Sequence, residues 1–167
     1  MGAVPRRLIP ALLALALLAA APAADGRTSP KKGIWGPARV DGVSQFPIYR
    51  TLGARLYHTR LRWNDVATAP PAVPGDPGDP AYHWPAALDD AVALARKAKM
   101  RVAIEVAGTP RWANGGKAAN YAPDDPADYA RFMEAAVRRY RSVRYWVIWG
   151  EPTRRPNWMP LPFTRPD

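Results

Sequence analysis

Apolar and polar side chains alternate with a period of two residues along ARLYHTRLRW, residues 54–63. One face of this segment carries His58, Arg60 and Arg62. The opposite face carries the large apolar side chains, Tyr57, Leu61 and Trp63. A period of two is typical of a β-strand with two different faces. The pattern therefore predicts a strand whose polar groups need partners on one side of a sheet.

Other segments extend this pattern into an alternating order of strands and helices. Short apolar runs closed by glycine or proline predict further strands at residues 33–37, 101–108 and 143–149. Helical spacing and terminal charges predict helices at residues 46–53, 86–100 and 124–140. Residues 69–85 are rich in proline and glycine, which predicts a long structured loop.

The resulting order β-α-β-α-β-α-β indicates an α/β protein with a parallel sheet. Two architectures fit this order: a doubly wound open sheet, or part of an eight-stranded α/β barrel. The sequence after the first strand, GIWGPARVDG, lacks the GxGxxG spacing of a dinucleotide-binding turn. The doubly wound alternative therefore loses support.

The beginning of the chain has the features of a secretion signal. Arg6 and Arg7 precede an apolar run, and small residues offer a cleavage site after Ala23 or Ala24. We expect residues 1–24 to be a signal peptide and the protein to be secreted or periplasmic; an uncleaved anchor is the alternative. Residues 25–32 are expected to be a disordered lead-in, 33–160 a partial barrel domain, and 161–167 a truncated tail.

Charge and composition help to decide whether the protein binds nucleic acid, a metal ion or a cofactor. The formal net charge is +10, and loss of the two signal-peptide arginines lowers it by two. The basic residues are scattered, which favours a basic surface over a nucleic-acid footprint. Cysteine is absent, so a packed core must supply stability. His58 and His83 lie on different predicted elements without ligand spacing, so we expect no metal and no cofactor.

Tryptophans recur where the predicted strands end. Four of the seven lie there, at Trp35, Trp63, Trp112 and Trp149. Indole faces stack on sugar rings, so an aromatic rim with a carboxylate, Glu151, suggests carbohydrate binding. The alternative for each tryptophan is that it anchors a loop onto the sheet.

The segments YWVIWGEP and TRRPNWMP resemble the end of the fourth strand in retaining glycoside hydrolases of the large (β/α)8-barrel clan that includes cellulases, xylosidases and arabinosidases. The matching residues are Trp146, Trp149, Glu151 and Pro152. Two further segments, GARLYHTRLRWNDV and AGTPRWANGG, are similar to the clan's second strand and third-strand loop, so the likeness covers residues 32–160.

The resemblance implies the first half of a (β/α)8 barrel, with strands one to four, and an oligo- or polysaccharide as partner. It implies that Glu151 is the acid/base and that the nucleophile belongs to the seventh strand. Gly150 departs from the clan's usual asparagine. His58 stands where many relatives have an arginine, a role that Arg60 or Arg62 could take.

The chemistry of glycoside hydrolysis gives Glu151 the same role. The acid must stay protonated, which burial among apolar side chains favours, and Trp149 is its neighbour. Glu105 lies inside the strand RVAIEVAG and is expected to point into the barrel. A buried glutamate needs a partner, so we interpret Glu105 as a structural ion-pair residue, with substrate positioning as the alternative.

Three functions follow from these patterns. The first is an N-terminal fragment of a secreted retaining glycosidase, inactive alone because it lacks the C-terminal half of the barrel, which a full barrel of about 250 residues would contain. The second is a non-catalytic carbohydrate-binding or surface protein with a degenerate barrel, to which Gly150 points. The third, nucleic-acid binding, has only the net charge in its favour. Neither of the first two involves a membrane after signal cleavage.

Overall fold

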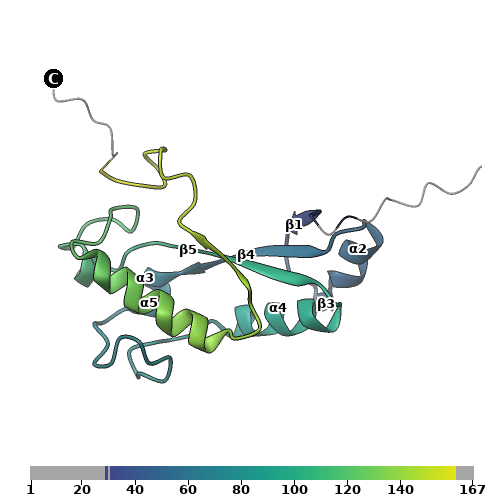
Figure 1. Cartoon of the computed structure of the whole chain (residues 1–167), viewed down its shortest axis with the longest axis horizontal. Coiled ribbons are helices and arrows are strands. Elements are labelled where there is room, and N and C mark those ends of the chain that lie inside the picture. Colours follow the sequence, from purple (N-terminus) through teal and green to yellow (C-terminus); the bar gives the residue numbers. More distant parts are fainter. Residues whose placement is uncertain (1–28, 30, 161–167) are drawn as a thin grey trace, which may run out of the picture.

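The computed structural model describes residue 29 and residues 31–160, which form a parallel sheet with helices along one face (Figure 1). The expected signal peptide at residues 1–24 and the expected tail at 161–167 lie outside the described residues. Most of the expected lead-in at 25–32 does so too. The fold that positions the candidate site is therefore that of the expected domain at 33–160.

The parallel sheet predicted from the element order is confirmed. Its strands are β1 (Gly33–Trp35), β4 (Leu56–Arg62), β5 (Arg101–Ala107) and β6 (Tyr145–Ile148). All neighbours pair in parallel, and the spatial order β1-β4-β5-β6 follows the chain. A doubly wound sheet reverses its strand order at a switch point. The described strands contain no such reversal.

The helices are α2 (Phe46–Thr51), α3 (Trp63–Val66), α4 (Ala86–Lys97) and α5 (Pro126–Arg139), with a 3-10 turn at Arg111–Ala113. Helices α2, α4 and α5 follow the predicted segments, whereas α3 and the 3-10 turn were not predicted. Helix α5 begins with Pro126, and the Asp125 carboxylate accepts a hydrogen bond from the backbone N–H of Ala127 at 2.8 Å. Figure 1 shows α4 and α5 along the same side of the sheet.

The hydrophobic core lies between the sheet and these helices. Leu61 of β4 and Ile104 of β5 are almost completely buried against Ala95 of α4 and Phe132 of α5. Phe132 stacks on Trp63 at a ring-centroid distance of 5.6 Å. The helix-covered face of the sheet is thus the face that the period-two pattern identified as apolar.

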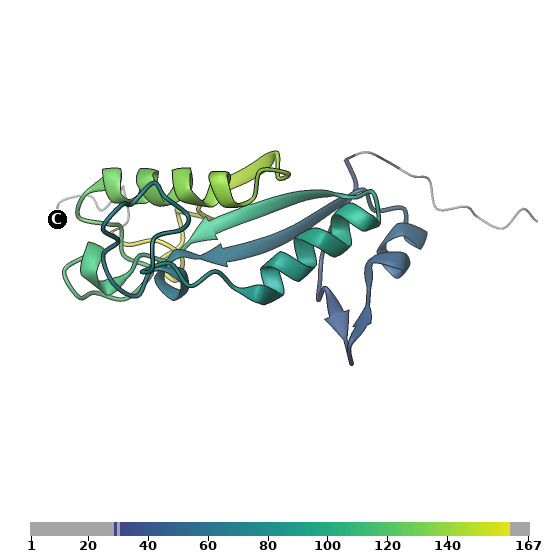
Figure 2. The ribbon, with the colours of Figure 1, turned by 90° about the horizontal axis from the view of Figure 1, so that it is seen from below.

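A hairpin that the pattern did not predict precedes α2. Its strands are β2 (Arg39–Val40) and β3 (Val43–Ser44), which pair antiparallel. The two turn residues, Asp41 and Gly42, both have positive φ, at 48° and 77°. Positive φ at both positions favours an Asp-Gly turn. Figure 2 shows this hairpin projecting at the end of the molecule away from α5.

The loop at residues 69–85 is ordered by internal hydrogen bonds, as its composition predicted. The buried carboxylate of Asp79 accepts from the backbone N–H groups of Val73 and Ala81 at 2.7 and 2.9 Å. These bonds hold the pKa of Asp79 below its usual value. Burial raises the pKa of the Tyr82 phenol to about 12. The loop therefore packs as part of the domain.

Candidate functional site

The polar residues of the strands lie on the face of the sheet away from the helices, which we call the open face. Strand register places Arg60 of β4, Glu105 of β5 and Val147 of β6 in one row across the sheet. His58 and Ala103 form part of the row before it. The intervening residues, such as Leu61 and Ile104, face the core. The alternation along the strands thus places the polar side chains on the open face and the apolar side chains of the core on the other face.

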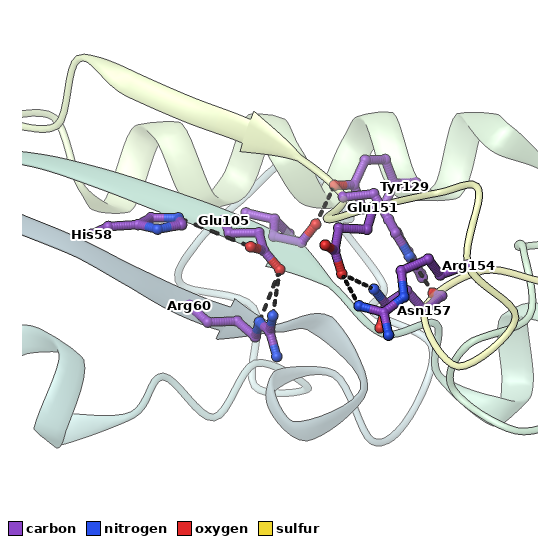
Figure 3. A network of polar contacts seen from close by, with 9 residues as sticks. His58, Arg60, Glu105, Tyr129, Glu151, Arg154 and Asn157 are labelled. Atoms are coloured by element: carbon purple, nitrogen blue, oxygen red, sulfur yellow. Dashed lines mark hydrogen bonds and ion pairs between the residues drawn. The ribbon is translucent and has the colours of Figure 1, made fainter. Parts of the chain in front are cut away.

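Glu105 is the buried charge at the centre of the open face, with only 5% of its surface exposed. Its Oε1 accepts hydrogen bonds from Arg60 Nε at 2.9 Å and lies 2.8 Å from Arg60 Nη2 (Figure 3). Its Oε2 lies 3.9 Å from His58 Nε2, beyond hydrogen-bond distance. His58 Nε2 is buried and has no hydrogen-bond partner among the described residues. Within the same residues, Oε1 of Glu105 is held by Arg60 and Oε2 accepts no hydrogen bond.

Gly150 lies directly against this carboxylate. A Cβ atom at position 150 would stand 2.7 Å from Glu105 Oε1 and 3.0 Å from Oε2. Side-chain carbon atoms do not approach other atoms this closely, so residue 150 must be small for Glu105 to occupy its place. Trp149 and Glu151, on either side of Gly150, have positive φ values of 58° and 46°. The chain therefore turns sharply at the end of β6, with Gly150 facing β5.

A polar pocket of about 140 Å³ opens beside this contact, at the carboxyl ends of the strands. Its lining comes from β4, β5 and the loops that follow β5 and β6; it includes Arg60, Arg62, Glu105, Asn120, Trp149 and Asn157. In parallel α/β proteins, ligands bind at this end of the sheet. The pocket is therefore the candidate site of the described residues.

Glu151 lies next to the pocket without lining it. Its Oε2 accepts hydrogen bonds from Arg154 Nη1 at 3.0 Å and from Asn157 Nδ2 at 2.9 Å (Figure 3). Its side chain is 61% exposed. The expected burial of Glu151 among apolar side chains is therefore not seen, because the turn after β6 directs its carboxylate toward the following loop.

The four tryptophans of the expected rim are divided between two environments. Trp35 is 56% exposed and lies on the open face, with its ring 4.4 Å from that of His58 and 5.2 Å from the Arg60 guanidinium. Trp149 is buried, lines the pocket and donates its indole N–H to the Asn157 carbonyl. These two residues lie where a ligand on the open face could reach them.

The other two tryptophans belong to the packing of the domain. Trp63 is 1% exposed and lies in the core, so its ring faces are covered by neighbouring side chains. Trp112 contacts Trp63 edge-on at 5.7 Å and donates its indole N–H to the Ala67 carbonyl at 2.8 Å. Trp63 leaves β4 on the same face as Leu61, which is why it enters the core. The structure therefore places these two as loop anchors, the alternative given for each tryptophan.

The remaining expected residues lie on or near the pocket. Arg62 lines it and also pairs with Asp65 at 3.3 Å. His58 stands one row further from the carboxyl ends, between Trp35 and Glu105. The sequence reasoning assigned no role to Asn120 and Asn157, which reach the pocket from loops. Only the segment PNWMP, singled out for its resemblance, pointed toward Asn157.

A second, apolar pocket of about 300 Å³ lies beside the end of β6. It is lined by Tyr129 of α5, by Ile148 and Trp149, and by Pro152 and Trp158 of the following loop. Ile148 is 68% exposed. The edge of the sheet at β6 is therefore more apolar than the open face.

Residues 29 and 31–160 contain neither an arranged metal-ligand group nor a membrane-spanning helix. Within these residues, no group of three or more histidine, cysteine or acidic side chains is arranged to hold a metal ion. Within the same residues, no helix has the length and apolar character needed to cross a membrane.

Comparison with known proteins supports the architecture. No protein-family model and no curated protein matches the sequence. Among solved structures, a family 39 glycoside hydrolase from the gut symbiont Bacteroides cellulosilyticus WH2 is similar, with a TM-score of 0.58 and 19% sequence identity. The similarity covers 77% of this chain and 26% of that one. This similarity shows a shared fold, and the chain spans about a quarter of that structure's length.

Proposed function

We propose that residues 33–160 form the first half of a (β/α)8 barrel of a retaining glycoside hydrolase and bind a saccharide at the carboxyl ends of their strands. The observation that carries this proposal is the position of Glu151. It directly follows Gly150, which lines the polar pocket and contacts the buried carboxylate of a neighbouring strand. Glycoside hydrolysis needs a carboxyl group beside the place where the sugar binds, and Glu151 stands next to this pocket.

The free edge of the sheet supports the barrel. Tyr145, Val147 and Ile148 of β6 are exposed, although β-strands of this composition are usually covered. Strands that run in sequential order and all in parallel can continue around a closed eight-stranded barrel. A fifth strand beside β6 would pair with its backbone, and closure of the barrel would cover Tyr145 and Val147 on the open face. In the proposal, the open face becomes the interior of that barrel.

In this mechanism, Glu151 is the acid/base. As a carboxylic acid it donates a proton to the glycosidic oxygen while a second carboxylate attacks the anomeric carbon, and as a carboxylate it then removes a proton from the attacking water. The second carboxylate stands about 5 to 5.5 Å from the first in retaining enzymes. We assign it to a later strand of the barrel. Barrel closure and substrate binding would exclude water from Glu151, which favours its protonated form.

Export is also a proposal, which rests on the pattern of residues 1–24. Expression in a bacterial host, followed by sequencing of the N-terminus of the product outside the cytoplasm, tests it. The expected N-terminus is Ala24 or Asp25. Retention of the protein in the cytoplasm with Met1 or Gly2 at its N-terminus would exclude export.

A non-catalytic carbohydrate-binding protein is the second candidate. Two observations favour it: the exposure of Glu151 and its engagement by Arg154, which neutralises the carboxylate in its charged form. This candidate keeps the pocket on the open face and gives Glu151 only a structural role. Catalysis by Glu151 therefore distinguishes the two.

The experiment uses the longest reading frame that contains these residues, because the nucleophile is assigned to a later strand. Hydrolysis of dinitrophenyl and methyl-substituted phenyl glycosides is compared between the wild type and Glu151→Ala. Loss of the acid should slow hydrolysis of the methyl-substituted phenyl glycosides, which have poor leaving groups, by about 100-fold or more. Hydrolysis of the activated dinitrophenyl glycosides should slow far less. Added azide should restore turnover of the dinitrophenyl substrate and give a glycosyl azide of retained configuration, because azide attacks the intermediate without base assistance.

Glu134→Gln is the matched control, since Glu134 is an exposed glutamate on the far side of the sheet, on α5. It should leave both rates unchanged. If hydrolysis is present and Glu151→Ala leaves it unchanged for both leaving groups, the assignment of the acid/base is wrong. Saccharide binding without hydrolysis by the longest reading frame would favour the non-catalytic candidate.

A further inference from the structure

The polar pocket contains an acceptor without a donor. Glu105 Oε1 accepts a hydrogen bond from Arg60 Nε and lies 2.8 Å from Arg60 Nη2, whereas Oε2 has no hydrogen bond within the described residues and lies 3.9 Å from His58 Nε2. Glu105 is more than nine-tenths buried and lines the pocket. A carboxylate oxygen that faces a pocket can accept a hydrogen bond from a ligand's O–H or N–H group. The free oxygen therefore marks a place where a ligand's donor would be stabilising.

Each charged residue of the pocket lining has a partner of opposite charge. Of its lining residues, Arg60, Arg62 and Glu105 are charged. Arg60 is paired with Glu105, and Arg62 is paired with Asp65. An anionic ligand would have to compete with these carboxylates for either guanidinium. A neutral ligand that carries O–H donors complements the free oxygen better than an acidic one does.

The surroundings of Arg60 add an aromatic surface. Trp35 is exposed on the same face and contacts the Arg60 guanidinium, and Trp149 forms a wall of the pocket. A polar acceptor in a pocket with an indole wall, on the same face as a second indole, suits a ring that has hydroxyl groups at its edge and C–H groups on its faces. Sugars have this character.

We propose that Glu105 is the residue that fixes a neutral sugar unit in this pocket, with Oε2 accepting a hydrogen bond from a ring hydroxyl. Gly150 is the position that makes this possible, because any side chain there would displace the carboxylate. The backbone of Gly150 does not have a left-handed φ, so space is the reason for glycine. This inference deepens the proposed function and depends on its saccharide-binding part, whereas it does not require catalysis by Glu151.

Binding to the full chain tests the proposal. Sugars are added to the protein, and the shifts of its amide and indole N–H signals are followed by NMR. The neutral ligands are the methyl glycosides of xylose, glucose, galactose, mannose and arabinose. The acidic ligands are the methyl glycosides of glucuronate and galacturonate. We expect saturable binding of at least one neutral glycoside, with Trp149 among the shifted residues, and at least fivefold weaker binding of the corresponding uronate. Failure of every neutral glycoside to bind, or tighter binding of a uronate, overturns the proposal.

Deoxy sugars then show whether a hydroxyl contacts Glu105 directly. For the best neutral ligand, the wild type should lose about tenfold in affinity when one particular hydroxyl is removed, the size expected for a hydrogen bond to a charged group. Glu105→Gln should bind the parent sugar about tenfold more weakly and lose less than twofold on removal of that hydroxyl. Equal losses in both proteins would mean that Glu105 is purely structural, which overturns the proposal.

Gly150→Ala provides a second route if Glu105→Gln does not fold. It keeps the carboxylate and moves it, so the affinity for the neutral sugar should fall at least fivefold. Gly33→Ala is its matched control, because a Cβ at that strand glycine meets only ordinary contacts at 3.6 Å or more. Unchanged affinity in Gly150→Ala contradicts the proposal. Because hydrolysis is not measured, a failure of Glu151 as acid/base would leave these results intact.

Discussion

Replacement of Arg60 by methionine removes the only hydrogen-bonding partner that Glu105 has among the described residues. Methionine keeps much of the aliphatic packing of arginine and loses the charge. The variant therefore leaves a carboxylate that is buried and unpaired. His58 Nε2, at 3.9 Å, is too distant to replace the lost hydrogen bonds without movement.

The size of the effect follows from the unequal exposure of the two partners. Glu105 has 7% of its side chain exposed, and Arg60 has 43%. Breaking a fully buried pair costs about 3–5 kcal/mol of unfolding free energy, whereas an exposed pair is worth about 0–1 kcal/mol. Because only one partner is buried here, we expect about 2–3 kcal/mol for Arg60→Met. At about 2–4 °C per kcal/mol, Tm should fall by about 4–12 °C.

Urea unfolding followed by tryptophan fluorescence measures this loss, with Arg62→Met as the control. Arg62 lies two residues further along the same face, but both it and its partner Asp65 are more than half exposed. It should therefore cost less than about 1 kcal/mol. The double variant Arg60→Met, Glu105→Leu removes the unpaired carboxylate and should regain most of the stability. Equal stabilities of Arg60→Met and Arg62→Met would refute the reasoning.

Further predictions concern the core, the open face and the loop at residues 69–85. Phe132→Ala should lower the unfolding free energy by about 3–5 kcal/mol in urea denaturation, because this ring is buried and stacked between two tryptophans. Trp35→Ala should weaken binding of neutral glycosides in NMR titrations and leave Tm within about 2 °C, because this indole is exposed. The lowered pKa of Asp79 adds stability that is present above about pH 4 and lost as pH falls through the folded-state pKa, so Asp79→Asn should flatten the fall of Tm between pH 5 and pH 2. The pKa of Tyr82, about 12, adds stability that is lost as pH rises from about 10 to 12, so the Tm difference between wild type and Tyr82→Phe should shrink over that range in differential scanning calorimetry.

The sheet could be predicted because the alternation of polar and apolar residues is visible within each short strand segment. In β4, the alternation that separates Arg60 from Leu61 is visible in the sequence, and it decides which side chains meet the helices. The same alternation placed Trp63 on the face of Leu61. Its burial could have been predicted from that pattern, but its position near the end of a strand suggested a ligand contact. The Asp41–Gly42 turn was a readable hairpin signal as well.

The site depended on contacts between distant segments, which no local pattern reveals. Glu105 and Gly150 are separated by 45 positions, and they meet only because β5 and β6 pair in one particular register. Asn157 reaches the pocket through a loop whose course has no periodic signature. The sequence predicted a buried Glu105 that needs an ion-pair partner, and it predicted burial for Glu151 as well. The structure places Glu105 in the interior and Glu151 toward solvent, whereas burial had been expected to protect the acid at 151.

The turn at the end of β6 links the position of the Glu105 carboxylate to the direction of the Glu151 carboxylate. Trp149 and Glu151 both have left-handed φ values, which cost a residue with a side chain about 1 kcal/mol or more each. The turn is held by the backbone N–H of Trp149, which bonds to the Val106 carbonyl at 3.0 Å, and by its indole bond to Asn157. Asn157 also donates to Glu151. Any shift of Gly150 away from Glu105 must therefore rotate Glu151 as well, so the position of the buried carboxylate and the direction of the exposed one are set together.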